Sequence, residues 1–68
     1  MSVDAEALRR LRAAQPLTVR ELAERSGVSY NTVTMLENSH RTANPSTVRR
    51  LAAALGVEPR ELMGQGGG

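Results

Sequence analysis

The stretch that most constrains the fold runs from Thr18 to Asn38, where two short amphipathic segments are separated by almost no linker. The first segment opens with Thr18, and Glu21 follows three residues later, which is the spacing of a capping box. Gly27 stands where a helix ends in a left-handed residue, because it has no Cβ to strain that conformation. Ser29 is a suitable cap for a second helix. The chain is therefore expected to reverse within about four residues, as in a helix-turn-helix.

The second segment divides into two faces when its residues are placed at about 100° per residue. The apolar stripe consists of Thr32, Val33 and Leu36, and the opposite face carries Tyr30, Asn31, Thr34, Met35 and Asn38. Carboxamides can pair with adenine, and methyl-bearing groups can contact the thymine methyl, so the second face has the chemistry of a base-reading surface. A solvated polar face is the plainer interpretation of this helix alone. The tight turn in front of it favours the base-reading surface.

A first helix is expected ahead of this stretch, from a cap at Ser2 through about Ala14. Asp4 would lie in its first turn, where a negative charge suits the positive end of the helix dipole. Leu8 and Leu11 are three positions apart and form its buried side. This segment adds one amphipathic helix to the two of the helix-turn-helix.

Two more helices are expected towards the C-terminal end. Asn44 and Pro45 begin a fourth helix, as a cap followed by a first-turn proline. Its apolar residues repeat at the helical positions Val48, Leu51, Ala52 and Leu55. A short fifth helix is expected over residues 59–63, where Leu62 and Met63 either close the core or contact a second subunit.

No alternating pattern indicates a strand, so the predicted fold is all-α with five helices, the second and third forming the helix-turn-helix. Residues 1–63 are expected to make one domain, followed by a flexible glycine-rich tail at residues 64–68. The chain has no Cys, which excludes disulfides and thiol metal ligands and favours an intracellular location. No apolar run approaches the roughly 18–20 residues that a membrane span needs.

Two motifs resemble those of a known family: LAERSGVSYNTV at residues 22–33 and PSTVRRLAAALGV at residues 45–57. Over roughly residues 4–63 the chain resembles the lambda-repressor-like domain of the Cro and Xre family, a helix-turn-helix DNA-binding fold. The resemblance implies a cytoplasmic, nucleoid-associated transcriptional regulator, expected to be a repressor. It also implies sequence-specific binding to double-stranded DNA as a homodimer, with the third helix, near residues 30–38, in the major groove.

The resemblance assigns roles to particular side chains. The expected base-contacting residues are Tyr30, Asn31, Thr34 and Met35. The expected phosphate-contacting residues are Thr18, Arg20, Ser29, Asn38 and Arg41, with His40 as the next choice in the loop of Arg41. Val19 departs from the family pattern, because many relatives carry a Gln there that touches a phosphate. Ser39 departs as well, because relatives commonly have a glycine at that place.

The resemblance further pairs Arg12 of the first helix with Glu37 near the end of the third. Glu37 lies at the border of the apolar face, where an unpaired carboxylate would be costly. We expect this ion pair to lock the first helix to the third.

Catalysis and cofactor binding have no support in the sequence. The chain holds one His, its carboxylates are spread over exposed helix positions, and its glycines cluster near the C-terminal end instead of forming a phosphate-binding loop. No metal site and no small-molecule site are expected. All nine basic residues are Arg, yet the net charge is only +2, so charge alone does not establish nucleic-acid binding. The alternative is a protein-interaction module, such as an antitoxin or an adaptor, that uses the same fold.

Overall fold

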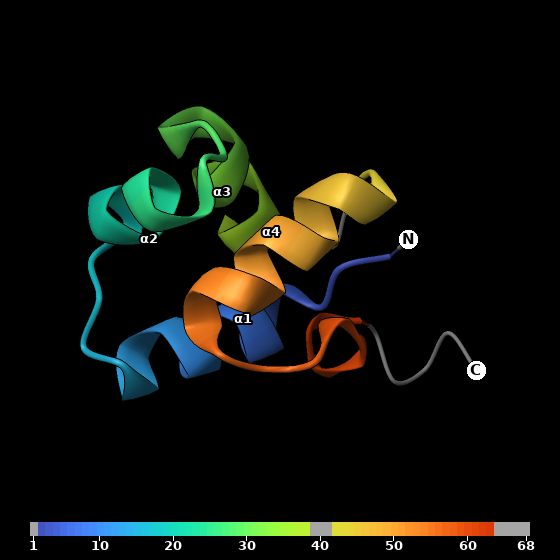
Figure 1. Cartoon of the computed structure of the whole chain (residues 1–68), viewed down its shortest axis with the longest axis horizontal. Coiled ribbons are helices and arrows are strands. Elements are labelled where there is room, and N and C mark those ends of the chain that lie inside the picture. The colour runs from blue at the N-terminus through green and yellow to red at the C-terminus, as the bar shows by residue number, and fades with distance from the viewer. Residues whose placement is uncertain (1, 39–41, 64–68) are drawn as a thin grey trace.

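The computed structural model describes residues 2–38 and 42–63. Four α-helices, α1 (Ala5–Ala14), α2 (Val19–Ser26), α3 (Tyr30–Asn38) and α4 (Pro45–Leu55), are followed by one 3-10 turn, η1 (Pro59–Leu62). In Figure 1, α2 and α3 lie at one end, α4 crosses the middle, and α1 and η1 lie on the opposite side. The described part is helical as predicted. The expected fifth helix is only a four-residue 3-10 turn, because the backbone becomes extended at Met63.

The core is formed by apolar side chains from every element. Its buried members are Val3, Leu8, Leu17, Leu22, Ala23, Val33, Leu36, Val48, Leu51, Ala52, Leu55 and Leu62. α2 packs against both α3 and α4, while α1 packs against α3 and η1. Leu62 is fully buried, so it closes the core of its own chain and is not available to a second subunit.

The cap of α1 differs from the prediction. Asp4, not Ser2, is the capping residue, and its carboxylate accepts hydrogen bonds from the amides of Glu6 at 3.0 Å and Ala7 at 3.3 Å. A carboxylate at this position both satisfies these amides and faces the positive end of the helix. The helix therefore starts two residues later than a cap at Ser2 would place it.

The residues before α1 are held by segments far along the chain. Ser2 forms an antiparallel bridge with Thr42, and Val3 forms one with Met63. The amide of Asp4 donates to the Leu62 carbonyl at 2.8 Å, and Val3 is fully buried. These contacts join the N-terminal end to η1 and to the segment that leads into α4.

α4 begins and ends where the sequence predicts. Asn44 is the N-cap residue and Pro45 opens the helix, although the Asn44 side chain makes no capping hydrogen bond. Gly56 follows the helix with a φ of 72°, a left-handed conformation that costs glycine little. Within the described ranges, no helix has the length and hydropathy needed to cross a membrane.

Candidate nucleic-acid interface

A capping box fixes the start of α2, as predicted. The Thr18 hydroxyl accepts from the Glu21 amide at 3.0 Å, and the Glu21 carboxylate accepts from the Thr18 amide at 2.9 Å. The bond from the Thr18 amide and the contact with its hydroxyl lower the pKa of Glu21 below its ordinary value of 4.5. The next two amides, of Val19 and Arg20, stand at the positive end of the helix outside the box. This end of α2 can therefore receive an anion.

The turn between α2 and α3 is held by a left-handed glycine and a buried hydroxyl. Gly27 has a φ of 73°, and its amide donates to the Ala23 carbonyl at 3.0 Å. The Ser26 hydroxyl donates to the same carbonyl at 3.3 Å and accepts from the Val28 amide at 3.2 Å. Sequence reasoning missed this role of Ser26. A serine directly before the turn glycine, in an otherwise buried position, is the signal that could have indicated it.

Ser29 caps α3 through its side chain. Its hydroxyl accepts from the Thr32 amide at 3.2 Å and donates to the Thr32 hydroxyl at 2.7 Å. Ser29 is exposed, so it can reach a phosphate, but it must then give up the bond to the Thr32 hydroxyl in order to donate. Thr32 belongs to the expected apolar stripe and is only half-buried.

The exposed side of α3 carries most of the predicted base-contacting residues. Tyr30 is 55% exposed and Met35 is 41% exposed, and they are the exposed large hydrophobic side chains of the described residues. Asn31 is also exposed, and its side-chain amide donates to the Met35 sulfur at 3.9 Å. Asn38, at the end of the helix, is exposed as well. These four side chains form a surface that we call the α3 ridge.

Thr34 stands apart from the α3 ridge. It is half-buried, and its hydroxyl oxygen is covered without a hydrogen-bond partner in the described part of the chain. The hydroxyl must therefore rotate before it can reach a base edge. The helical wheel gives the direction of Thr34 but does not show what covers it.

The ion pair between Arg12 and Glu37 is present, as the resemblance implied. The guanidinium Nε lies 2.6 Å and Nη2 lies 3.0 Å from the two carboxylate oxygens, which is a bidentate arrangement. A third donor, Nη1, reaches the carbonyl of Leu17 at 2.7 Å. The hydrogen bond to Glu37 raises the pKa of Arg12 above its ordinary value, so the guanidinium stays charged. One side chain therefore ties α1 to α3 and to the linker before α2.

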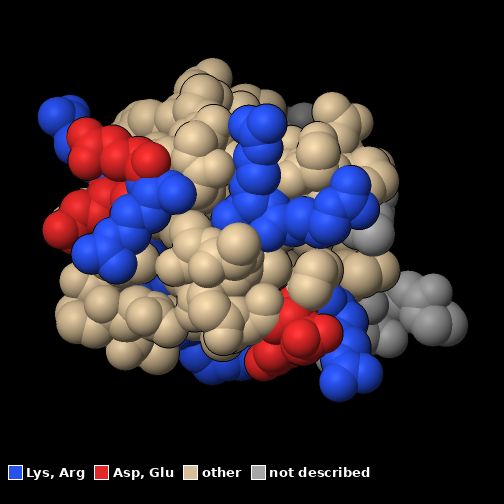
Figure 2. Space-filling view, viewed as in Figure 1, with Lys and Arg blue, Asp and Glu red and all other residues tan. Residues whose placement is uncertain are grey.

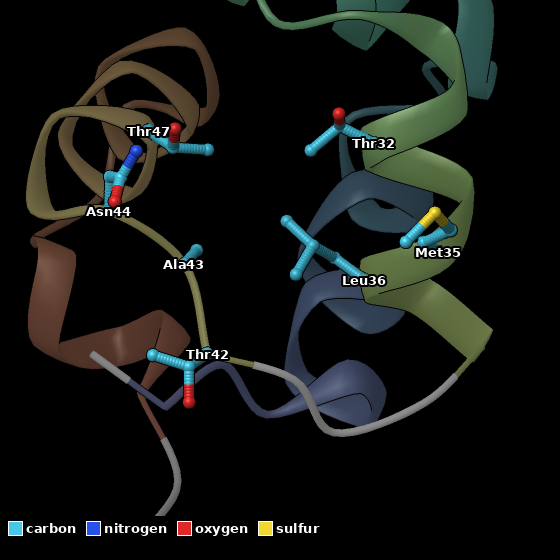
Figure 3. Close-up of a pocket in the computed structure, with 7 residues that line it drawn as sticks. All are labelled: Thr32, Met35, Leu36, Thr42, Ala43, Asn44 and Thr47. Atoms are coloured by element: carbon cyan, nitrogen blue, oxygen red, sulfur yellow. The ribbon is translucent and has the colours of Figure 1, made fainter.

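Two hollows flank the α3 ridge. One, of about 450 Å³, lies between α3 and the start of α4 (Figure 3). It is lined by Thr32, Met35, Leu36, Thr42, Ala43, Asn44 and Thr47. The other, of about 480 Å³, is lined by Arg20, Ala23, Glu24, Val28 and Tyr30. It brings a predicted phosphate contact, Arg20, to the same hollow as a predicted base contact, Tyr30.

Charge is distributed unevenly around this surface. α3 contains a single charged residue, Glu37, which is buried and paired. Figure 2 shows basic side chains across the middle of the molecule, where α4 runs, and acidic ones beside α2. The part of that view over α3 is largely without charged atoms. Arg41 and His40, the phosphate contacts expected in the loop after α3, lie outside the described residues.

Comparison with known proteins places this geometry in a family. A family model described as helix-turn-helix matches residues 8–62. The chain is 44% identical to the uncharacterized HTH-type transcriptional regulator RghRB of Bacillus subtilis (strain 168), over 98% of this chain and 49% of that protein. It is 41% identical to the HTH-type transcriptional repressor RghR of the same organism, over 91% of this chain and 47% of that protein. The chain spans about half the length of these curated relatives.

Two solved structures share the fold. The restriction-modification controller protein C.AhdI from Aeromonas hydrophila superposes with a TM-score of 0.80 at 37% identity, over 87% of this chain and 89% of that one. Streptomyces albus HEPD, solved with its substrate 2-hydroxyethylphosphonate and Fe(II), gives a TM-score of 0.82 at 41% identity. That match covers 87% of this chain but only 13% of HEPD, so the likeness concerns a small part of the larger protein.

Proposed function

Because the chain belongs to the helix-turn-helix family, we propose that it binds double-stranded DNA through α3 and regulates transcription, acting as a repressor. One observation carries this proposal: the α3 ridge is exposed, uncharged and polar, and it directly follows a turn held by Gly27 and Ser26. A rigid turn of this kind presents the second helix at a fixed angle, which is what insertion into the major groove needs.

In this mechanism α3 enters the major groove and α2 crosses above it, with its N-terminal end facing a phosphate. The amides of Val19 and Arg20 and the Thr18 hydroxyl bind that phosphate, and the Arg20 side chain supplies positive charge beside Tyr30. Such phosphate contacts set the position and orientation of the protein on the duplex. They are needed because α3 itself carries no exposed charge.

The base-reading contacts come from the α3 ridge and from Thr34. Asn31 can bond adenine through both its amide nitrogen and its oxygen, a contact that contributes about 1–3 kcal/mol of discrimination. Tyr30 and Met35 offer apolar surface for a thymine methyl, and Thr34 contributes after rotation of its hydroxyl. Ser29, Asn38 and Arg41 complete the phosphate contacts on either side of the helix. The helices α2 and α3, which carry the described members of this set, lie together at one end of the molecule (Figure 1).

One α3 ridge can read only a few base pairs, so a single domain would bind weakly. We therefore infer a homodimer on DNA, with the two copies on inverted half-sites about one helical turn apart. A cytoplasmic location on the nucleoid follows from this function.

Titration against random duplex at two salt concentrations tests the proposal. A DNA-binding protein releases counterions, so its affinity falls steeply as salt rises. Arg20→Ala should lower affinity for every sequence and reduce the salt slope by about one. Arg60→Ala is the matched control, because it removes the same charge from η1, which packs against α1 and α4.

Asn31→Ala should instead remove sequence preference and leave the affinity for random duplex nearly unchanged. Equal loss on all sequences would show that Asn31 does not read bases. The uncharged α3 ridge also suits a protein-interaction module such as an antitoxin or adaptor. That function predicts almost no salt slope and no DNA binding at physiological salt, so the same titration separates the two. Selection of bound sites from a random DNA pool then identifies the operator.

A further inference from the structure

Two members of the α3 ridge are in contact with each other. The side-chain nitrogen of Asn31 lies 3.9 Å from the sulfur of Met35, within the reach of a hydrogen bond to sulfur. The residues are four apart on one helix, so their side chains are neighbours along its axis. Both are exposed, and both belong to the set proposed to contact bases. Their contact is therefore part of the surface that would meet a duplex.

The chemistry of the two groups fixes the orientation of the carboxamide. A thioether sulfur can accept a hydrogen bond but has no proton to donate. The carboxamide has a donating nitrogen on one side and an accepting oxygen on the other. A half-turn of the amide would bring its oxygen against the sulfur, where two acceptors repel. Met35 thus favours the orientation in which the nitrogen of Asn31 faces the C-terminal end of α3 and the oxygen faces the other way.

The order of donor and acceptor along the groove carries sequence information. Adenine offers the N6 donor and the N7 acceptor side by side, and a carboxamide pairs with both when its oxygen faces N6 and its nitrogen faces N7. The second hydrogen on the Asn31 nitrogen is available for N7 while the first is bonded to sulfur. An amide of fixed orientation therefore fits adenine on one strand better than adenine on the other.

We propose that Met35 is a positioning residue that orients the Asn31 carboxamide, so that the pair distinguishes an A·T from a T·A base pair. This inference rests on the proposed DNA-binding function and adds the base preference and the side chain that sets it. A neutral hydrogen bond contributes about 0.5–1.5 kcal/mol, and sulfur is a weak acceptor, so the lower end applies. The expected change in the ratio of affinities is about two- to threefold.

The test is a double-variant cycle on DNA. Duplexes are selected from a random pool with the wild-type chain, and the position read by Asn31 is identified as the one whose preference Asn31→Ala removes. The ratio of affinities for A·T over T·A at that position is then measured for Met35→Leu, which keeps an apolar side chain without sulfur. Met63→Leu, at the other described methionine, is the matched control.

In the wild-type background, Met35→Leu should lower the A·T over T·A affinity ratio by about two- to threefold. In the Asn31→Ala background, Met35→Leu should leave this ratio unchanged. An unchanged ratio in the wild-type background overturns the proposal. An equal effect in both backgrounds also overturns it, because Met35 would then act on that base pair without Asn31. If the wild-type chain shows no sequence preference on any duplex, the proposed function fails together with this inference. If the wild-type chain has a preference that Met35→Leu does not change, only this inference fails.

A measurement without DNA gives an independent check. In the ¹⁵N–¹H NMR spectrum, the two side-chain amide protons of Asn31 should shift in Met35→Leu and stay in place in Met63→Leu. Backbone amide shifts of α2 should be unchanged in both variants, which shows that the fold is intact. An Asn31 side-chain signal that does not respond to Met35→Leu contradicts the proposed contact.

Discussion

Glu37→Ala is the substitution for which the structure allows the most specific prediction. The Glu37 side chain is 6% exposed and accepts two hydrogen bonds from Arg12, whose side chain is 21% exposed. Removal of one partner from a fully buried ion pair costs about 3–5 kcal/mol, chiefly because the other charge is stranded. Arg12 can turn partly into water and keeps its bond to the Leu17 carbonyl. We therefore expect a smaller loss for Glu37→Ala, about 2–3 kcal/mol.

Arg12→Ala should be the more damaging of the two substitutions. It strands the carboxylate of Glu37, which is nearly inaccessible to water, and it also removes the donor to the Leu17 carbonyl. A loss of about 3–5 kcal/mol is expected. A domain of this size has a total stability of only about 3–10 kcal/mol, so the variant is close to unfolding. The unequal losses are themselves a prediction, because a simple exposed ion pair would cost about the same from either side.

The assay is urea unfolding of the wild type, both single variants and the double variant, followed by circular dichroism at a low temperature where every variant is folded. Arg12→Met serves as a second substitution at that position, because it keeps the apolar stem if the alanine variant does not fold. A coupling energy of about 1–2 kcal/mol is expected. Losses that add to within about 0.5 kcal/mol would refute the idea that the pair locks α1 to α3.

Three further substitutions test the turn, the cap and the N-terminal segment. Gly27→Ala should lower the free energy of unfolding in urea by about 1–2 kcal/mol, because the left-handed backbone at this position disfavours alanine. A steric clash adds nothing, since the new Cβ would meet only Arg50 Nη1 at 3.9 Å. Gly27→Asn should cost less, because asparagine tolerates this conformation better. Glu21 has a lowered pKa, so its contribution to stability is present above pH 4.5 and is lost as pH falls through the folded value. Glu21→Gln keeps an acceptor for the Thr18 amide but does not titrate, so the fall in melting temperature below pH 4.5 should be smaller in this variant than in the wild type. The same fall in both proteins would assign the acid dependence to other carboxylates. Val3→Ala should lower stability by about 1–3 kcal/mol in the same urea assay, whereas a loss near zero would show that the segment before α1 does not hold the core.

Features that depend on contacts within about four residues could be predicted from the sequence. The capping box of Thr18 and Glu21, the left-handed Gly27 and the proline start of α4 are all of this kind, and the structure confirms them. Each follows from the needs of a helix end, where unpaired amides and carbonyls must find partners nearby. The same reasoning predicted the wrong cap for α1. Ser2 instead forms an antiparallel bridge with Thr42, far along the chain, and Asp4 caps the helix.

Contacts between side chains and distant parts of the chain were the second kind of feature that local sequence patterns did not predict. The Gln15 side chain donates to the Leu55 carbonyl at 2.7 Å and joins the end of α1 to the end of α4, yet nothing in the local pattern around Gln15 indicates this. The contact between Arg12 and Glu37, which also joins residues far apart in the sequence, was expected only because of the family resemblance. Periodicity shows which side of a helix faces inward but does not identify its partners.

Family membership does not determine which base sequence the domain prefers. The distribution of buried and exposed residues over α3 explains why. Val33 and Leu36 face the core and hold the helix in place, whereas Asn31 and Met35 are exposed and contribute little to folding. Exposed residues can therefore change the preferred DNA sequence while stability stays within about 0.5 kcal/mol. The double variant Asn31→Ala, Met35→Leu tests this separation, since it should unfold at the wild-type urea concentration while losing the wild-type DNA preference. A large loss of stability in that variant would mean that the surface of α3 and its interior are coupled.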